Sequence, residues 1–354
     1  MDHLKPLDGM RAIAVLIVFI AHCGLDKIVP GGMGVTIFFF LSGYLITSLM
    51  RSEVDKTGSI DLKAFYIRRT LRIWPPLYIS MAVTLAIALI VPYKLDITFS
   101  GIVSQILFFN NYAGQLGIGA GVPWMPLWSL AVEEHFYIFF PLLYVLLFRS
   151  WRPAHVALAC AIGCVIVLLV RIYTAAQIEN IGAIYYWSHT RIDSILFGCC
   201  LAMWQNPALD KGAWRPKAGH AAAAIAVLLA CLVLRDPWFR QTFRYSLQGV
   251  ALFVIFGYAL SARGLVITML SGSLLRIVAL FSYTLYLIHP TFIAAIEYAW
   301  PDIPRLILIA TAGATSMGYA ALMYHFVEQP AARMRRRLHK VDAQATQAVP
   351  LPAT

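Results

Sequence analysis

The sequence predicts an all-α, polytopic integral membrane protein of about ten transmembrane helices, with its N- and C-termini in the cytoplasm. Hydrophobic residues make up 60% of the 354 residues and charged residues only 13%, whereas an average soluble domain carries about 25% charged residues. The mean hydropathy is +0.73. We therefore expect one transmembrane domain, residues 1–340, followed by a short disordered cytoplasmic tail, residues 341–354.

Apolar runs of roughly the length that crosses a bilayer predict the individual helices. In chain order these runs lie near residues 10–23, 33–50, 74–91, 127–148, 154–173, 189–205, 218–234, 245–261, 277–298 and 304–326. The stretch 100–114 is short and carries several amide side chains, so we interpret it as an interfacial or re-entrant element on the outer face. That topology places most lysine and arginine residues on the cytoplasmic side, as the positive-inside rule requires.

The composition also narrows the class of function. The net charge of +11 fits basic cytoplasmic loops that contact anionic lipid, so nucleic acid is not an expected partner. The six cysteines lie in or beside apolar runs and form no CxxC pair, so we interpret them as small hydrophobic residues and expect no metal site. Walker, GxGxxG, HExxH and GxSxG motifs are absent from the sequence, which argues against the enzymes that these motifs mark.

The motif WSLAVEEHFY at 128–137 opens the fourth span from the outer side. Glu133 and Glu134 then reach the membrane depth of His22, at the outer end of the first span. Only one of the two carboxylates is expected to face His22, because neighbouring positions on a helix point about 100° apart. A carboxylate beside a histidine raises its basicity and fixes its tautomer, as a general base requires. The alternative is a buried polar pair that holds two helices together.

Two further motifs place ionisable residues inside the spans. Arg191 and Asp193 of YYWSHTRIDSILFG are two positions apart, so we expect them to point different ways and to pair with other spans. A structural salt bridge is weighed equally with a substrate contact. His289 of FSYTLYLIHP precedes a helix-kinking proline and is either functional or a satisfied core histidine.

On the cytoplasmic side, the stretch FYIRRTLRIWPP joins the second and third spans. Arg69 and Arg72 are three positions apart, so on a helical turn they project together and can clamp a phosphate. Snorkelling to lipid headgroups would produce the same pattern. In the second span, Ser42 and Tyr44 of LSGYL either pack against another helix or contact a ligand.

These stretches together resemble the acyltransferase 3 family of membrane-bound O-acyltransferases. The matching segments follow the family's order between residues 7 and 330 and read LDGMRAIAVLIVFIAH, GVTIFFFLSGYLIT, FYIRRTLRIWPPLY, WSLAVEEHFYIFFPLL, RIDSILFGCCLA, YTLYLIHP and HFVEQP. The resemblance implies ten transmembrane helices in the bacterial cytoplasmic (inner) membrane. It also implies transfer of an acyl group, expected to be acetyl, from cytoplasmic acyl-coenzyme A to a hydroxyl of a cell-surface or exported carbohydrate.

The same resemblance implies roles for individual residues. The family's arginine–ten residues–histidine motif falls on Arg11 and His22, and its RxxR motif falls on Arg69 and Arg72. We expect the three arginines to bind the acyl-coenzyme A donor, His22 to act as the general base, and Glu133 or Glu134 to support it. Candidate acceptor-binding or structural residues are Ser42, Tyr44, Trp128, Ser129, Arg191, Asp193 and His289. Arg11 lies about 16 Å from His22 along a straight helix, so a structural ion pair with Asp8 is its alternative role.

Several alternatives stay open at the level of the sequence. A proton-coupled secondary transporter would use the same His/Glu pair as a relay, although the two halves of the chain lack the internal symmetry that many transporters have. Transfer proceeds either directly or through an acylated His22. The acceptor sugar and the acyl chain are not fixed by the sequence. The expected partners are acyl-coenzyme A, a carbohydrate and the bilayer, and no permanently bound cofactor is expected.

Overall fold

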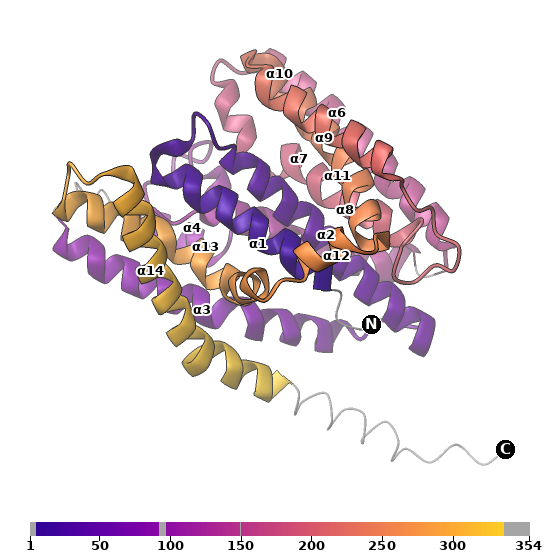
Figure 1. Cartoon of the computed structure of the whole chain (residues 1–354), viewed down its shortest axis with the longest axis horizontal. Coiled ribbons are helices and arrows are strands. Elements are labelled where there is room, and N and C mark those ends of the chain that lie inside the picture. The colour runs from indigo at the N-terminus through magenta and orange to yellow at the C-terminus, as the bar shows by residue number, and fades with distance from the viewer. Residues whose placement is uncertain (1–4, 92–96, 149, 336–354) are drawn as a thin grey trace.

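The computed structural model describes residues 5–91, 97–148 and 150–335, which form a bundle of tilted helices (Figure 1). The tail predicted at 341–354 lies outside the described residues. Within the described ranges the chain forms helices and no named strand; one isolated bridge joins Ile97 to Ala120. The all-α fold class is therefore confirmed.

Eight helices are long and apolar enough to cross a membrane among the described residues. They contain α1 (Lys5–Ile20, continued by the π-helical turn η1, Ala21–Leu25), α2 (Gly31–Thr57), α3 (Leu62–Ile90), α5 (Leu127–Leu143, continued by η3, Tyr144–Phe148), α6 (Pro153–Gln177), α11 (Phe243–Ser261), α13 (Ser273–Ala299) and α14 (Arg305–Met323, continued by η5, Tyr324–Glu328). Two shorter apolar helices, α8 (Asp193–Met203) and α9 (Ala218–Val233), occupy the remaining predicted spans. Each of the ten predicted apolar runs thus overlaps one of these helices.

The connections are short helical elements. They are α4 (Phe99–Ile106), η2 (Asn110–Tyr112), η4 (Ile181–Tyr185), α7 (Ser188–Arg191), α10 (Pro237–Gln241) and α12 (Leu265–Leu270). At a rise of 1.5 Å per residue, α4 is only about 12 Å long and too short to cross the hydrocarbon core. The side chain of Gln105 in α4 pairs with both backbone groups of Val122, at 2.9 and 2.7 Å. This segment therefore folds back on itself, which agrees with the interpretation of 100–114 as an element that does not cross.

The third span begins about twelve residues earlier than the sequence analysis expected. The run before Pro75 and Pro76 is the first half of α3, and both prolines lie inside the helix. The helix begins after Asp61, whose carboxylate accepts a hydrogen bond from the Ala64 amide at 2.9 Å, as an N-cap residue does. The prediction of a connecting stretch was wrong, because the span was placed from its apolar run alone and the basic residues before that run continue the same helix. Arg69 and Arg72 are consequently fixed on a helix.

Small residues bring α2 and α8 into close contact. A Cβ atom on Gly43 would lie 2.0 Å from the carbonyl oxygen of Ile195, and one on Gly198 would lie 2.1 Å from that of Phe40. Both glycines therefore allow backbone to pack against backbone, which is how small residues drive helix association in membranes. This contact holds α2 and its Ser42 in place.

Replacing Gly198 by valine is expected to destabilise the fold by about 3 kcal/mol, because the carbonyl of Phe40 cannot move away without displacing α2. The measurement is the fraction of monodisperse protein that survives heating in detergent. Gly318→Val is the matched control, since a Cβ on Gly318 meets no atom within 4 Å. Equal heat resistance of the two variants would contradict the proposed role of Gly198.

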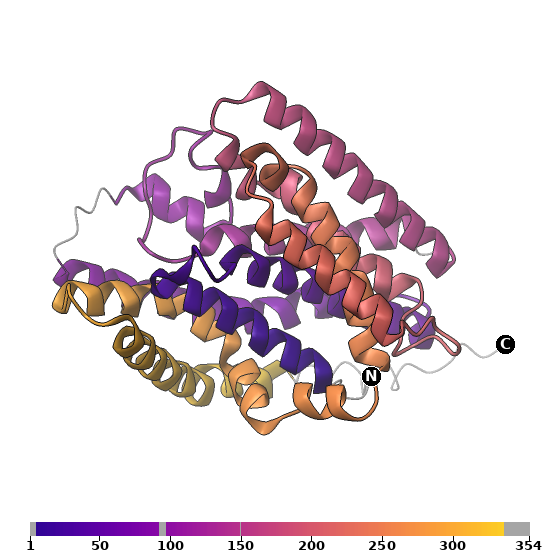
Figure 2. The same cartoon turned by 45° about the horizontal axis from the view of Figure 1, so that its top comes forward.

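The start of the first helix and the end of the last helix lie on the same side of the molecule. Figure 1 places the N-terminal end of α1 (indigo) and the C-terminal end of α14 (yellow) on its lower side, and Figure 2 shows α1 and α6 slanting in the same direction through the bundle. A chain that crosses the membrane an even number of times has its two ends on the same side. The side of the membrane on which both ends lie stays a prediction.

Candidate active site

A cavity of about 360 Å³ gathers six of the thirteen candidate site residues singled out in the sequence. Five helices contribute to it: α1, α2, α3, α5 and α13. The predicted residues in its lining are Arg11, Ser42, Arg69, Arg72, Ser129 and Glu133. This size falls within the range of small-molecule sites, about 300 to 1,000 Å³. The cavity therefore unites motifs that are separated by up to 122 positions in the sequence.

One part of the cavity is cationic. Arg11 of α1 meets Arg69 and Arg72 of α3 in its lining, with Asp8 beside them. The Arg69 guanidinium lies over the ring of Tyr137 at 5.1 Å and near the ring of Phe65 at 5.8 Å, so its plane is fixed by aromatic contact. Three guanidinium groups around one cavity are suited to bind an anion of several negative charges.

The two neighbouring carboxylates face different surroundings, as the helical geometry predicted. Ser42 Oγ donates a hydrogen bond to Glu133 at 2.8 Å, and the Tyr137 hydroxyl donates to the other oxygen of the same carboxylate at 3.3 Å. Glu133 lines the cavity, whereas Glu134 is buried on another side of α5. The structure pairs neither carboxylate with His22; the hydrogen bond that holds His22 comes from another helix.

His22 lies in the π-helical turn η1 that ends α1. Such turns occur frequently at functional sites, because they widen the helix and redirect a side chain. Gly24 completes the turn with φ +84°, and a Cβ there would lie 2.8 Å from the side chain of Arg305. The positive φ favours glycine at this position. The turn leaves His22 exposed while its neighbours Ala21 and Cys23 are buried.

His22 is hydrogen-bonded to His289 of α13. His22 Nδ1 lies 2.7 Å from His289 Nε2, and His289 Nδ1 lies 2.9 Å from the carbonyl oxygen of Leu285. A carbonyl oxygen only accepts, so in the neutral pair His289 Nδ1 carries the proton and His289 Nε2 accepts one from His22 Nδ1. His22 Nε2 is then left with a free lone pair. The carboxylate expected to fix this tautomer is thus replaced by a histidine.

Tyr286 connects the histidine pair to the cavity. Its ring lies 6.0 Å from the ring of His289, its hydroxyl lies 2.6 Å from Ser129 Oγ, and it lines the cavity. The sequence analysis did not select Tyr286 or Tyr137. Their spacing from selected residues would have found them, because Tyr286 precedes His289 by three positions and Tyr137 follows Glu133 by four, and such positions share a helix face.

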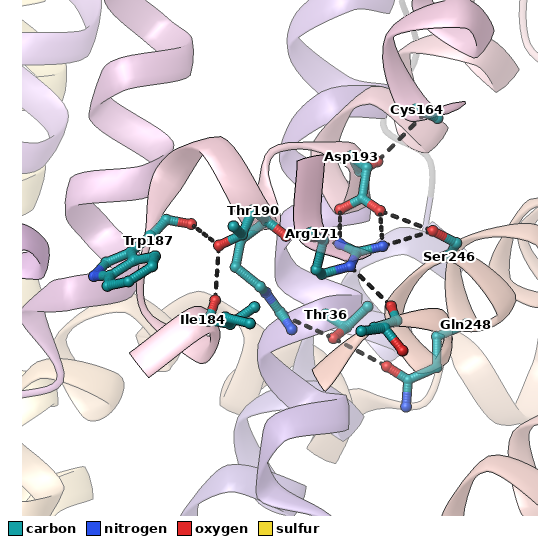
Figure 3. A network of polar contacts seen from close by, with 11 residues as sticks. Thr36, Cys164, Arg171, Ile184, Trp187, Thr190, Asp193, Ser246 and Gln248 are labelled. Carbon is teal, nitrogen blue, oxygen red and sulfur yellow. Dashed lines mark hydrogen bonds and ion pairs between the residues drawn. The ribbon is translucent and has the colours of Figure 1, made fainter. Parts of the chain in front are cut away.

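Arg191 and Asp193 have different partners, as predicted, and neither lines the cavity. Asp193 forms a fully buried ion pair with Arg171 of α6 at 2.8 Å (Figure 3). Arg191 donates to Thr36 Oγ1 at 3.2 Å, and its guanidinium lies 3.7 Å from the centre of the Tyr245 ring. Both residues therefore connect helices, Asp193 through a salt bridge and Arg191 through a hydrogen bond and a ring contact.

The remaining candidates lie in packing positions. The Tyr44 hydroxyl donates to Asn206 at 2.9 Å and is completely buried. The indole of Trp128 lies 4.6 Å from the ring of Tyr185 and 6.1 Å from that of Phe39. Neither residue lines the cationic cavity.

Comparison with known proteins agrees with this site. The chain matches a family model described as an acyltransferase domain over residues 5–325. O-acetyltransferase OatA of Staphylococcus aureus, in strains NCTC 8325 / PS 47 and MRSA252, is 31% identical over 348 residues, which cover 93% of this chain and 57% of the relative. A protein from strain COL, whose name gives it provisionally as an O-acetyltransferase, is 30% identical with the same coverage. The chain thus spans 57% of the length of these relatives.

No solved structure gives a significant match to the chain. The family match takes in the arginines of the cavity, Glu133 and both members of the histidine pair, because all of them lie between residues 5 and 325. The protein therefore belongs to the acyltransferase 3 family.

Proposed function

We propose that this protein is a membrane-bound O-acyltransferase that moves an acyl group, acetyl by preference, from cytoplasmic acyl-coenzyme A to a hydroxyl of a cell-surface or exported carbohydrate. The observation that carries the proposal is the cavity in which Arg11, Arg69 and Arg72 meet. A proton-coupled transporter using a His/Glu pair has less support, because His22 is bonded to His289 rather than to a carboxylate.

The arginines bind the donor in this proposal. The phosphates of coenzyme A carry several negative charges, and arginine forms bidentate hydrogen bonds with phosphate oxygens. Glu133 lines the same cavity, fixed by Ser42 and Tyr137. The long pantetheine arm would carry the thioester from the arginines past Glu133 toward Tyr286. Acetyl is the preferred acyl group because the relatives are named O-acetyltransferases.

His22 acts as the general base. Its Nε2 lone pair accepts the proton of the acceptor hydroxyl while that oxygen attacks the thioester carbonyl carbon. The carbon–sulfur bond then breaks, the ester forms, and the proton held by His22 passes to the leaving thiolate to give free coenzyme A. The hydrogen bond to His289 keeps Nδ1 protonated and Nε2 available throughout, as an orienting partner does in other base-assisted acyl transfers. We assign the protein to the bacterial cytoplasmic membrane on the basis of this chemistry.

The direct test is transfer of label from radiolabelled acetyl-coenzyme A to cell-envelope glycan, in membranes that contain the protein and in membranes that lack it. Label in the glycan fraction of the first membranes alone supports the proposal. A pH gradient-dependent uptake of solute without any consumption of acetyl-coenzyme A would instead support the transporter.

Replacing Arg72 by glutamine is expected to raise the KM for acetyl-coenzyme A by about 10- to 100-fold with a smaller effect on kcat. The loss of one charge-assisted hydrogen bond costs about 1.5–3 kcal/mol, and each 1.4 kcal/mol corresponds to about a factor of ten. Steady-state kinetics at fixed acceptor concentration measures the effect. Arg333→Gln is the matched control, because Arg333 is exposed and outside the cavity. An unchanged KM in the Arg72 variant would remove it from the donor site.

A further inference from the structure

A second cavity, of about 480 Å³, lies between the re-entrant segment and the chain that leads into α7. One wall comes from η2 and the residues after it, and the other comes from η4 and the residues after it. Asn111 ties the two walls together, because its Nδ2 donates to the carbonyl of Tyr186 at 3.3 Å and to Ser188 Oγ at 2.9 Å. The cavity is therefore formed before any ligand binds.

The lining of this second cavity consists of amides and aromatic rings. Its amide side chains are Asn110, Asn111, Gln115 and Asn180, and its aromatic side chains are Trp128, Tyr186 and Trp187. No aspartate, glutamate, lysine or arginine lines it in the part of the chain that the structure describes. This lining contrasts with the cationic cavity, in which three arginines meet.

Two side-chain oxygens in this cavity lack partners. Asn110 Oδ1 and Asn111 Oδ1 are buried and have no hydrogen-bond partner among the described residues, and Asn111 as a whole is only 5% exposed. A buried acceptor left unsatisfied costs about 1–3 kcal/mol. Both oxygens belong to residues that line the cavity and can only accept, so a ligand that met them after a small side-chain rotation would supply hydrogen-bond donors without a negative charge.

The aromatic rings supply the complementary surface. Tyr186 is 45% exposed and lies edge to face with Trp128 at 5.3 Å. The faces of such rings are electron-rich and attract the weakly positive C–H groups that line one face of a pyranose. Amides for the hydroxyl groups and ring faces for the C–H groups are together the recognition chemistry of an uncharged sugar.

We propose that this second cavity binds a neutral sugar residue of the acceptor glycan. The inference rests on the proposed function and deepens it, because it assigns the acceptor a binding site and states that the bound sugar is uncharged. The two cavities share a wall at the start of α5: Trp128 lines the neutral one and Ser129, the next residue, lines the cationic one. Ser129 is in turn bonded to Tyr286, beside His289. A sugar chain seated on Trp128 would thus lie next to Ser129 and Tyr286, which lead to the histidine pair.

The test measures sugar binding directly and contains no acyl donor. The purified protein in lipid nanodiscs is probed by saturation-transfer NMR with methyl glucoside, methyl galactoside and N-acetylglucosamine, and with glucuronate as the acidic comparison. We expect at least one neutral sugar to bind and glucuronate to bind at least tenfold more weakly. Tyr186→Ala and Asn110→Ala are each expected to weaken neutral-sugar binding at least tenfold. Tyr298→Ala, which removes a tyrosine of similar exposure on α13, is the matched control and should bind as the wild type does.

Absence of binding by all three neutral sugars, equal binding of glucuronate, or wild-type binding by both cavity variants would overturn the inference. Neither cavity variant is expected to disturb the fold. The Tyr186 side chain is substantially exposed, and Asn110 Oδ1 has no protein partner to lose. Failure of the proposed function gives a different result, namely sugar binding without acyl transfer. Acyl transfer without sugar binding in this cavity would support the proposed function but show that the acceptor binds at another site.

Discussion

Replacing His22 by alanine is expected to lower acyl transfer by about 10²- to 10⁴-fold, the usual contribution of a positioned general base. The loss should fall on kcat, because His22 does not line the cavity where the donor arginines lie. The measurement is label transferred from acetyl-coenzyme A to glycan at saturating donor. His22 is exposed, so its removal leaves no buried void and the variant should fold normally. Transfer at the wild-type rate would exclude His22 as the base.

The partner histidine gives this prediction a second, independent readout. His289→Leu removes the acceptor that keeps the His22 Nδ1 proton in place, so we expect it to lower kcat by less than His22→Ala and to leave the KM for the donor unchanged. Since two groups that act as a unit are not additive, the double variant should be no slower than His22→Ala alone. Additive losses would mean that His289, a positioning residue in this account, acts separately from His22. His220, on α9 and accepting a hydrogen bond from the Lys217 amide, provides the control substitution His220→Leu.

The sequence was informative about which residues matter and less so about how they pair. Spacing on one helix predicted that Glu133 and Glu134 face different neighbours, and the structure confirms it. The partner of His22 lies 267 positions away, and no periodicity along a helix reports which of several distant helices packs beside it. The sequence analysis considered only a carboxylate as the partner of His22, whereas the crossing of α1 with α13 brings His289 to it.

The fold, like the site, could be predicted from the sequence only in part. Hydropathy located the spans because every backbone group in lipid must be satisfied within a helix, which ties span length to bilayer thickness. The end of a helix that extends beyond its apolar run is determined by capping residues instead, so hydropathy misplaced the start of α3. Asp61 caps this helix, and two prolines are accommodated inside it. Arg171 was passed over as one charge within an apolar run, although its buried partner Asp193 had been selected.

That ion pair yields the largest effect expected on stability. Replacing Asp193 by alanine is expected to destabilise the protein by about 3–5 kcal/mol, because it leaves the Arg171 guanidinium buried without a counter-charge. Both side chains are completely buried, and the guanidinium also donates to the carbonyls of Thr242 and Thr190 and to Ser246 Oγ (Figure 3). Heat-induced unfolding of the purified protein, followed in detergent by the loss of monodisperse material, measures the effect.

The exposed pair between Arg305 and Glu297 is the matched control. It has a similar length, 2.7 Å against 2.8 Å, but its side chains are 55% and 41% exposed, and an exposed pair contributes only about 0–1 kcal/mol. Glu297→Gln should therefore unfold close to the wild-type temperature, whereas Asp193→Ala should unfold far below it. Replacing both members of the buried pair, by Arg171→Met with Asp193→Leu, should recover much of the loss, because removing both charges removes the uncompensated one. A double variant as unstable as Asp193→Ala would show instead that the backbone hydrogen bonds of Arg171, rather than its charge balance, hold α6, α8 and α11 together.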